Sequence, residues 1–216
     1  KPFSDRKIRV GIAGYGQCRF GAQFGFQNHP NVDVVAVTDL IASRRAELAK
    51  ACRCEKTYES CEEMIEDGNI EAVFIATDAP SHARLAIAAL KRGKHVASAV
   101  PAVWGSLEDA ERLFEAVKSS GLKYMMFETS YFHSDLYAWR KRYEAGVLGK
   151  LIYSEGEYFH YFPRPLGGYN PRTRRVDANG WRKDAFSFGQ YADYNYPDGT
   201  PLLLTFNWIQ GTEKGA

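Results

Sequence analysis

The chain has 216 residues, of which 45% are hydrophobic and 25% charged, a composition typical of a folded globular protein rather than a disordered one. Its 28 basic and 26 acidic residues give a formal net charge of +2 and are spread along the sequence, so neither a nucleic-acid surface nor a membrane surface is predicted. No apolar run has the length of a membrane span and no signal-peptide pattern precedes the first strand, so we expect a cytoplasmic location.

The first 128 residues alternate short β-branched apolar runs with amphipathic stretches, which is typical of a parallel sheet covered by helices. We predict five strands, at Ile8–Ala13, Val32–Thr38, Ile70–Thr77, His95–Ser98 and Lys123–Phe127. The fold class is therefore α/β, with a doubly wound Rossmann domain over residues 1–128.

Helix signals separate these strands. Ser60 followed by Glu63 forms a capping box, and Pro80 opens a helix that ends at Gly93. A third helix starts at Ser106 and ends before Gly121. The residues expected to line its apolar face are Leu107, Ala110, Phe114 and Val117.

The alternation of strand and helix patterns ends after residue 128, and we predict a second domain over 129–216. Ser134–Ala145 is predicted to be an amphipathic helix, closed by Gly146 and Gly149. An aromatic strand is predicted at Leu151–Phe162, and a hairpin from Tyr191–Tyr196 and Leu202–Trp208. This pattern favours an α+β domain with an open, mainly antiparallel sheet, interrupted by a long loop over 163–184.

A glycine-rich turn follows the first strand, in the run Gly11-Ile12-Ala13-Gly14-Tyr15-Gly16-Gln17-Cys18-Arg19-Phe20-Gly21. Glycines at such a turn let the backbone approach a pyrophosphate closely. The third glycine comes two residues later than in G-x-G-x-x-G, so either the turn is enlarged or Arg19 takes the third position. An ordinary tight turn between strand and helix is the alternative.

Asp39 ends the second strand, about 20 residues after the glycines, where an acid accepts hydrogen bonds from a ribose. A carboxylate there repels a 2′-phosphate, so NAD is favoured over NADP, although Arg44 and Arg45 would soften that preference. The alternative is an aspartate that only caps the following helix.

Four cysteines lie in the first third of the chain: Cys18, Cys52, Cys54 and Cys61. The C-x-C pair lacks the spacing and the histidine partners of a zinc site. We therefore predict reduced thiols and no metal site.

Four runs together resemble the Gfo/Idh/MocA family of oxidoreductases (glucose-fructose oxidoreductase, inositol dehydrogenase and MocA). They are Gly14-Tyr15-Gly16, Val35-Ala36-Val37-Thr38-Asp39, Ala76-Thr77-Asp78-Ala79-Pro80-Ser81-His82 and Ala89-Leu90-Lys91-Arg92-Gly93-Lys94-His95-Val96. The resemblance covers residues 7 to about 130 and is looser to 162. It implies a domain that binds NAD or NADP and a second domain for the substrate and for assembly of homo-oligomers.

Carried onto this chain, the resemblance places a set of residues along the cofactor. The predicted cofactor-binding residues are Gly14, Tyr15, Gly16, Gln17, Cys18, Asp39, Thr77, Pro80, His82 and Ala99. The family usually has Glu-Lys-Pro after the fourth strand, with the lysine assisting proton transfer, whereas this chain has Ala99-Val100-Pro101. Because valine neither donates nor accepts a proton, the usual lysine chemistry is absent.

Other side chains are therefore needed if the protein turns over a substrate. Histidine and tyrosine relay hydroxyl protons, so the predicted catalytic residues are Tyr131, His133 and His160, with Tyr158 and Tyr161 as neighbours. Tyr158 and His160 are two residues apart on one predicted strand, where alternate side chains share a face. Simple packing of aromatic residues is the alternative for each.

Family members are much longer than this chain, so we expect a shortened or discontinuous sequence between Asp184 and Tyr191. The leading hypothesis is an enzyme, an NAD(P)-dependent oxidoreductase that transfers hydride to or from a sugar, cyclitol or related small molecule. A non-catalytic dinucleotide-binding protein and a sugar-cleaving or epimerising enzyme that recycles NAD are the alternatives.

Overall fold

The computed structural model describes residues 2–16, 19–128 and 133–150, together with the backbone of strand segments 154–160, 169–170, 175–176 and 202–208. The chain divides into two compact units, Lys1–Phe127 and Glu128–Ala216. Each unit is described by itself.

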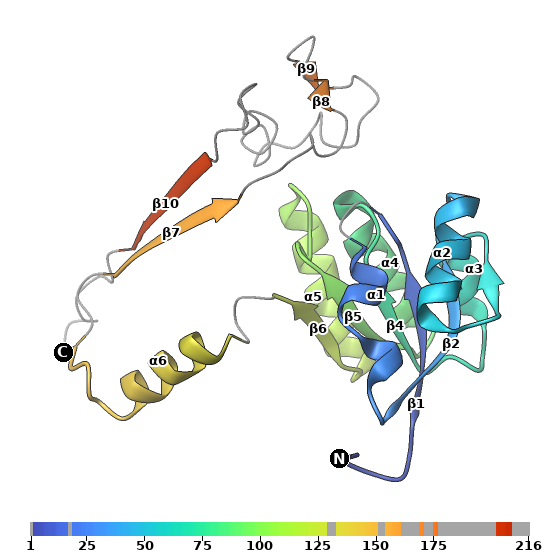
Figure 1. Ribbon diagram of the computed structural model, residues 1–216, viewed down its shortest axis with the longest axis horizontal. Coiled ribbons are helices and arrows are strands. Elements are labelled where there is room, and N and C mark those ends of the chain that lie inside the picture. Colours follow the sequence, from blue (N-terminus) through green and yellow to red (C-terminus); the bar gives the residue numbers. More distant parts are fainter. Residues whose placement is uncertain are drawn as a thin grey trace. The chain divides into compact units, whose positions relative to one another are not determined.

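One parallel sheet forms the centre of the first unit (Figure 1). Its described strands are β1 (Ile8–Ala13), β2 (Val32–Thr38), β3 (Thr57–Tyr58), β4 (Ala72–Ile75), β5 (His95–Ala99) and β6 (Tyr124–Phe127). They lie in the order β3-β2-β1-β4-β5-β6, and every neighbouring pair is parallel. The strand order reverses between β1 and β4, which is the point where doubly wound sheets bind their ligands. The predicted Rossmann-type fold of this unit is confirmed.

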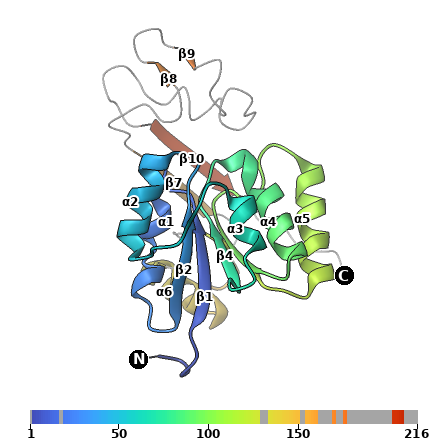
Figure 2. The same ribbon diagram turned by 90° about the vertical axis from the view of Figure 1, so that its right-hand side faces the viewer.

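Helices cover both faces of this sheet (Figure 2). The α-helices are α1 (Phe20–Gln23), α2 (Ala42–Cys52), α3 (Cys61–Glu66), α4 (His82–Lys91) and α5 (Leu107–Ser120). Two 3-10 turns accompany them, η1 (Phe26–Asn28) and η2 (Ala79–Ser81). Helices α1 and α2 lie on one face, and α3, α4 and α5 lie on the other.

An apolar layer fills the space beneath each set of helices. On the side of α3 to α5, Met64, Ile65 and Ile75 are at most 2% exposed. On the side of α1 and α2, Phe74 is 1% exposed and packs against the rings of Phe24, Phe26 and Phe127. Burying one such side chain contributes roughly 1.5–3 kcal/mol to the free energy of unfolding, so these layers hold the strands in register.

The helix ends predicted at Ser60, Ser106 and Gly121 are confirmed, whereas Pro80 lies in η2 and the helix predicted to open there begins at His82 and ends at Lys91, before Gly93. Ser60 Oγ accepts a hydrogen bond from the Glu63 amide over 3.1 Å, and Ser106 Oγ accepts one from the Asp109 amide over 3.1 Å. Gly121 ends α5 with φ of 65°, the left-handed conformation that glycine adopts without strain.

Three details differ from the sequence prediction. Leu107 and Phe114 are 86% and 66% exposed, so they do not line the buried face of α5. That face carries Leu113, 6% exposed, together with the predicted Val117, because α5 packs against α4 through a face that is turned slightly away from Leu107 and Phe114. Strand β3 was not predicted, since a two-residue strand has no period to detect. The strands predicted from Ile70 and from Lys123 begin at Ala72 and Tyr124 instead.

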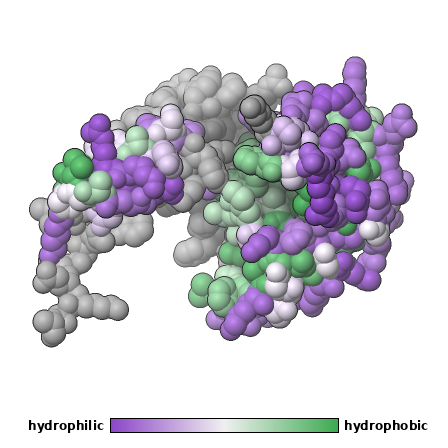
Figure 3. Space-filling model, turned by 90° about the horizontal axis from the view of Figure 1, so that it is seen from below, coloured by the Kyte–Doolittle hydropathy of each residue, from purple (hydrophilic) through white to green (hydrophobic). Residues whose placement is uncertain are grey.

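In the space-filling view, hydrophilic side chains cover much of the first unit's helical surface, with apolar areas among them (Figure 3). Exposed large apolar side chains of this unit include Phe3, Leu40, Leu107 and Phe114. No helix in the described part of the chain is both long enough and apolar enough to cross a membrane.

The second unit contains α6 (Ser134–Glu144), β7 (Ser154–His160), β8 (Tyr169–Asn170), β9 (Arg175–Val176) and β10 (Leu202–Trp208). Gly146 and Gly149 follow α6 with φ of 72° and 63°. Strand β10 pairs antiparallel with β7, which lies within the predicted strand Leu151–Phe162. The other predicted arm of the hairpin, Tyr191–Tyr196, lies outside the described residues, and the architecture of this unit remains a prediction.

Candidate functional site

The carboxyl ends of β1, β2, β4 and β5 meet at one edge of the sheet, because the strands are parallel. The turns that leave these ends carry most of the residues predicted to bind a cofactor. The glycine-rich turn leaves β1, Asp39 follows β2, Thr77 follows β4 and Ala99 ends β5.

Gly14 begins the glycine-rich turn in a conformation that other residues rarely adopt. Its φ is 99°, and a Cβ at this position would lie 2.2 Å from the Ala76 carbonyl oxygen and 2.8 Å from the Thr77 nitrogen. Its amide donates to the Thr38 carbonyl over 2.8 Å. Gly14 is therefore required by the close packing of this turn against the chain that leaves β4.

The turn is enlarged, which decides between the two arrangements that its glycine spacing left open. A Cβ on Gly21 would lie 2.3 Å from the Gly14 carbonyl oxygen and 3.3 Å from Ile12 Cγ2. Gly21 thus makes the close contact between helix and strand that the third glycine of a dinucleotide-binding turn provides. Arg19 precedes α1 with φ of 51° and does not take that position.

Gly16 faces open space, unlike Gly14 and Gly21. Nothing in the described structure lies within 4 Å of a Cβ placed on it. A bare backbone beside open space at the end of β1 is the feature that a pyrophosphate needs for close approach. The turn therefore fits the phosphates of a dinucleotide.

Asp39 is half-buried, and its two carboxylate oxygens have different partners. Oδ2 accepts from the Tyr15 amide over 2.7 Å, and Oδ1 accepts from the Ile41 amide over 2.8 Å. Asp39 therefore orders the residues just before α2 and also contacts the glycine-rich turn, while its predicted contact with a ribose stays a prediction. A carboxylate has about four lone-pair sites. Two remain for the hydroxyls of a ribose.

Arg45 was predicted to soften the preference for NAD, but its guanidinium has partners within the protein. Nη1 donates to the Asp39 carbonyl over 2.9 Å, and Nη2 lies 3.9 Å from Glu59 Oε1. Its side chain is 18% exposed, whereas Arg44 is an exposed residue. Arg45 thus fixes the position of Asp39. Sequence reasoning missed this role because it requires knowing where the main chain bends.

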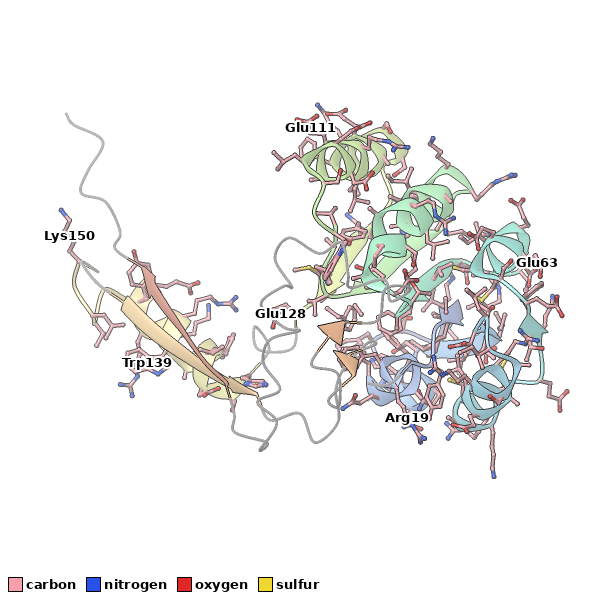
Figure 4. All side chains as sticks on the ribbon, turned by 90° about the horizontal axis from the view of Figure 1, so that it is seen from above. Arg19, Glu63, Glu111, Glu128, Trp139 and Lys150 are labelled. Atoms are coloured by element: carbon pink, nitrogen blue, oxygen red, sulfur yellow. The ribbon has the colours of Figure 1, made fainter. Side chains whose placement is uncertain are left out.

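The side-chain contacts of Arg19 were not predicted from the sequence. The side chain of Arg19 is labelled in Figure 4. Its guanidinium lies 5.4 Å from the centre of the Tyr15 ring and 3.6 Å from the carboxylate of Glu47 on α2. These contacts join the glycine-rich turn to the first two helices. The ring of Tyr15 itself is largely buried, at 8% exposure for the residue. Its backbone amide, through Asp39, is the part that shapes the site.

The turns after β4 and β5 hold the remaining described candidates. Thr77 is half-buried and Pro80 is exposed. His82 is 2% exposed, with Nδ1 2.7 Å from the Pro101 carbonyl oxygen and Nε2 3.2 Å from that of Thr77. Ala99 is 3% exposed, and Val100, in the position of the family's lysine, is 38% exposed.

The predicted catalytic residues belong to the second unit. His133 precedes α6 as an exposed residue, and its carbonyl accepts from the Tyr137 amide. His160 ends β7, where only the backbone is described. Tyr131 lies outside the described residues, as do the cofactor candidates Gln17 and Cys18. The catalytic roles therefore stay predictions.

The described cysteines are free thiols buried in the first unit. Burial raises the pKa of both Cys52 and Cys61 to about 12, and it also raises the pKa of Cys54. Among the described residues no group of three or more His, Cys, Asp or Glu side chains is placed to hold a metal ion.

Comparison with known families identifies this arrangement. The model of the GFO_IDH_MocA family, described as an oxidoreductase family with an NAD-binding Rossmann fold, matches residues 8–128, more than half of the chain. The chain belongs to the Gfo/Idh/MocA family. Family membership confirms the predicted resemblance, and NAD is the cofactor that this family's fold binds.

Several Gfo/Idh/MocA relatives are similar to the chain. Glycosyl hydrolase family 109 protein 1 of Bacteroides fragilis is 30% identical over 162 residues, which cover 71% of this chain and 35% of the relative. The scyllo-inositol 2-dehydrogenase (NAD(+)) of Bacillus subtilis is 28% identical over 153 residues, covering 70% of this chain and 44% of that enzyme. The chain spans about a third to a half of the length of these relatives.

Solved structures of Gfo/Idh/MocA proteins agree with the fold. The WlbA dehydrogenase from Bordetella pertussis, in complex with NADH and UDP-GlcNAcA, matches with a TM-score of 0.66 and 25% identity over 76% of this chain and 47% of that one. Scyllo-inositol dehydrogenase from Lactobacillus casei, with bound NAD(H) and scyllo-inositol, has a TM-score of 0.65 and 23% identity over 71% of this chain and 45% of that one.

Proposed function

We propose that this chain binds NAD at the carboxyl edge of its parallel sheet and belongs to an enzyme that oxidises or reduces a sugar, a cyclitol or a related polyhydroxylated molecule. The observation that carries the proposal is the contact between Asp39 and the Tyr15 amide. It places a carboxylate, with acceptor sites left over, beside a glycine-rich turn that is open to phosphates.

The residues of the chain have separate tasks in this proposal. Gly14 and Gly21 close the turn, Gly16 leaves room for the pyrophosphate, and Asp39 accepts from the ribose and disfavours a 2′-phosphate. NAD, when bound, supplies the hydride chemistry. Arg45 is engaged with Asp39, which favours NAD over NADP further.

The substrate proton needs another group, because Val100 stands where the family has lysine. We propose Tyr131, His133 and His160 for this task, since tyrosine and histidine relay hydroxyl protons near neutral pH. A sugar-like substrate is favoured by the names of the relatives, which include inositol dehydrogenases and a complex with UDP-GlcNAcA. A cytoplasmic location and homo-oligomers through the second unit remain predictions from the sequence.

The decisive test is calorimetric titration of the 216-residue chain with NAD and with NADP, repeated with Asp39→Ala. We expect NAD to bind more tightly than NADP. Losing the charged acceptor should reduce the ratio of the two affinities about tenfold, since a hydrogen bond to a charged group contributes about 1.5 kcal/mol. Equal affinity for both cofactors in the unsubstituted chain would contradict the proposed role of Asp39.

A second candidate function follows from the relatives named glycosyl hydrolase family 109 proteins. In an enzyme of that kind NAD would stay bound and be recycled while a sugar bond is cleaved. Assays on a panel of polyols and glycosides separate the two functions. Net formation of NADH, followed at 340 nm, supports the dehydrogenase, and cleavage without net NADH supports the second candidate. Bound NAD without any turnover favours a non-catalytic dinucleotide-binding protein.

A further inference from the structure

His82 is buried at the first position of α4, although the family resemblance predicted that it would line the cofactor. Its 2% exposure leaves almost no surface for a ligand, and each ring nitrogen faces a backbone carbonyl. Any effect of this side chain on the site must therefore pass through the two carbonyl groups that it contacts.

The two carbonyls belong to different turns at the carboxyl edge. Thr77 lies in the turn after β4, and Pro101 lies in the turn after β5, next to Val100. The shorter contact, 2.7 Å from Nδ1 to the Pro101 oxygen, is the one that best fits a full hydrogen bond. The contact from Nε2 to the Thr77 oxygen measures 3.2 Å.

The turn after β4 also supports the glycine-rich turn. The Ala76–Thr77 peptide lies so close to Gly14 that a Cβ on Gly14 would stand 2.2 Å from the Ala76 oxygen. Contacts therefore run without a break from Gly14, through Ala76 and Thr77, to His82 and on to Pro101. The imidazole of His82 contacts two of the three turns, and the packing of Gly14 against Ala76 joins the third to them.

Hydrogen bonds inside the turn after β4 make it a rigid link between the glycine-rich turn and His82. The Thr77 and Ser81 hydroxyl oxygens are 2.7 Å apart, and the Ser81 hydroxyl lies 2.8 Å from the Asp78 carbonyl oxygen. This turn runs directly into α4, so the backbone of His82 is already joined to it, and the 2.7 Å contact of the ring with Pro101 sets the turn after β5 against it.

We propose that His82 is a positioning residue that sets the turn after β5 against the glycine-rich turn and so fixes the nicotinamide half of the site without touching the cofactor. A doubly wound sheet consists of two mononucleotide-binding halves. Asp39 belongs to the half of β1 to β3, and Pro101 follows β5 in the other half. The inference rests on the proposed function, because it presupposes that NAD lies along this edge.

Calorimetry with NAD and with ADP-ribose tests the proposal, since ADP-ribose lacks only the nicotinamide ring. We expect His82→Leu to weaken NAD about tenfold and ADP-ribose less than about twofold, because only the nicotinamide half is released. In His82→Asn the amide nitrogen takes the place of Nδ1 and keeps the Pro101 contact. This variant should bind NAD within about threefold of the unsubstituted chain.

Lys94→Met is the matched control. Lys94 is also buried, at 6% exposure, and its Nζ donates to the carbonyls of Asp67 and Ile70 at the opposite edge of the sheet. We expect this variant to lower the melting temperature and to leave the ratio of NAD to ADP-ribose affinity unchanged. A ratio that shifts as much in Lys94→Met as in His82→Leu would overturn the proposal, because any loss of stability would then explain it.

The remaining outcomes are also decisive. An equal loss for both ligands in His82→Leu, or no loss for either, overturns the positioning role and leaves the proposed function standing. An unsubstituted chain that binds neither ligand overturns both. Should His82→Leu fail to fold, His82→Gln replaces it, since glutamine reaches the Nε2 position instead. Asparagine should then retain NAD better than glutamine, and the reverse order contradicts the proposal.

Discussion

The turn after β1 and the turn after β5 lie at the same edge of one sheet, yet they retain different amounts of the family's chemistry. The first keeps its close-packed Gly14, its open Gly16 and the carboxylate of Asp39. The second keeps Pro101 but has Val100 where the family has lysine. In the proposed function this difference separates the backbone and the one acid that would bind the dinucleotide from the side chain that would move a proton.

Gly14→Ala alters the turn after β1, and we expect it to have the largest effect of these variants on stability and on NAD binding. A methyl group at φ of 99° would overlap the Ala76 carbonyl, so we expect a loss of at least about 3 kcal/mol in the free energy of unfolding and no detectable NAD binding. Gly16→Ala is the control, because its Cβ meets nothing. It should keep its stability within about 0.5 kcal/mol and weaken NAD about tenfold. Circular dichroism and calorimetry measure both, and equal stability of the two variants would contradict the packing described.

Val100→Lys would restore the missing side chain in the turn after β5. Val100 is 38% exposed, so a lysine stem can extend from the surface. With general acid–base catalysis contributing about 100-fold or more, we expect a gain of that order in turnover of a polyol substrate, with NAD affinity unchanged. Val100→Met matches the length of lysine without its amine and should give no gain. If lysine brings none while NAD still binds, another group already performs the proton transfer.

Arg45→Gln tests how the turn after β2 selects between NAD and NADP. Removing the guanidinium that holds the Asp39 carbonyl should weaken NAD about threefold without improving NADP. Arg44→Gln, at an exposed neighbour, should change NAD affinity less than about twofold. Both variants are titrated with NAD and NADP. A selective loss of NADP in Arg45→Gln would instead identify Arg45 as a ligand of the 2′-phosphate.

The buried thiols allow the two faces of the sheet to be compared through their reactivity, and we expect the smallest effect here. Cys52 is the last residue of α2 and Cys61 is the first residue of α3, and burial on opposite faces of the sheet raises the pKa of each to about 12. At pH 8 neither these two thiols nor the buried Cys54 should react with Ellman's reagent in the folded chain, and all three should react after unfolding. Cys18→Ser removes the one thiol outside the described residues from this assay. Rapid reaction of the folded variant would show that a face opens.

The same thiols predict how stability depends on pH. Their ordinary pKa is 9.0, so above that pH the unfolded chain loses thiol protons that the folded chain retains. The free energy of unfolding should therefore fall as the pH rises from about 9 toward 12. Denaturant titrations of the unsubstituted chain and of Cys61→Ala, compared across this range, measure the contribution.

Local signals in the sequence were sufficient for much of the first unit. Ser60, Ser106 and Gly121 mark helix ends because a cap depends on residues only a few positions away. The inner face of α5 was assigned correctly only in part, since Val117 packs against the core but Leu107 does not, and only contact with α4 decides between Leu107 and Leu113. A two-residue strand such as β3 owes its existence to its neighbour β2 rather than to its own sequence.

The residues of the candidate site were likewise predictable only in part. Gly14 and Asp39 were predictable because a motif records their spacing, and the structure shows what each contacts. The partners of Arg45 and His82 were not, because they depend on backbone carbonyls whose positions only the folded chain fixes. Pro101, for example, is 19 residues from His82 in sequence.

Gly21 shows that the third glycine of such a motif is required by a contact rather than by a fixed spacing. Its Cα lies so close to the Gly14 carbonyl that only hydrogen fits between them, although it stands two residues later than the usual pattern places it. The number of residues between two glycines is therefore free to vary, provided that the helix returns to the same carbonyl. A search that fixes the interval would pass over this chain, whereas one that allows the loop to grow would find it and any others that lengthened their loop in the same way.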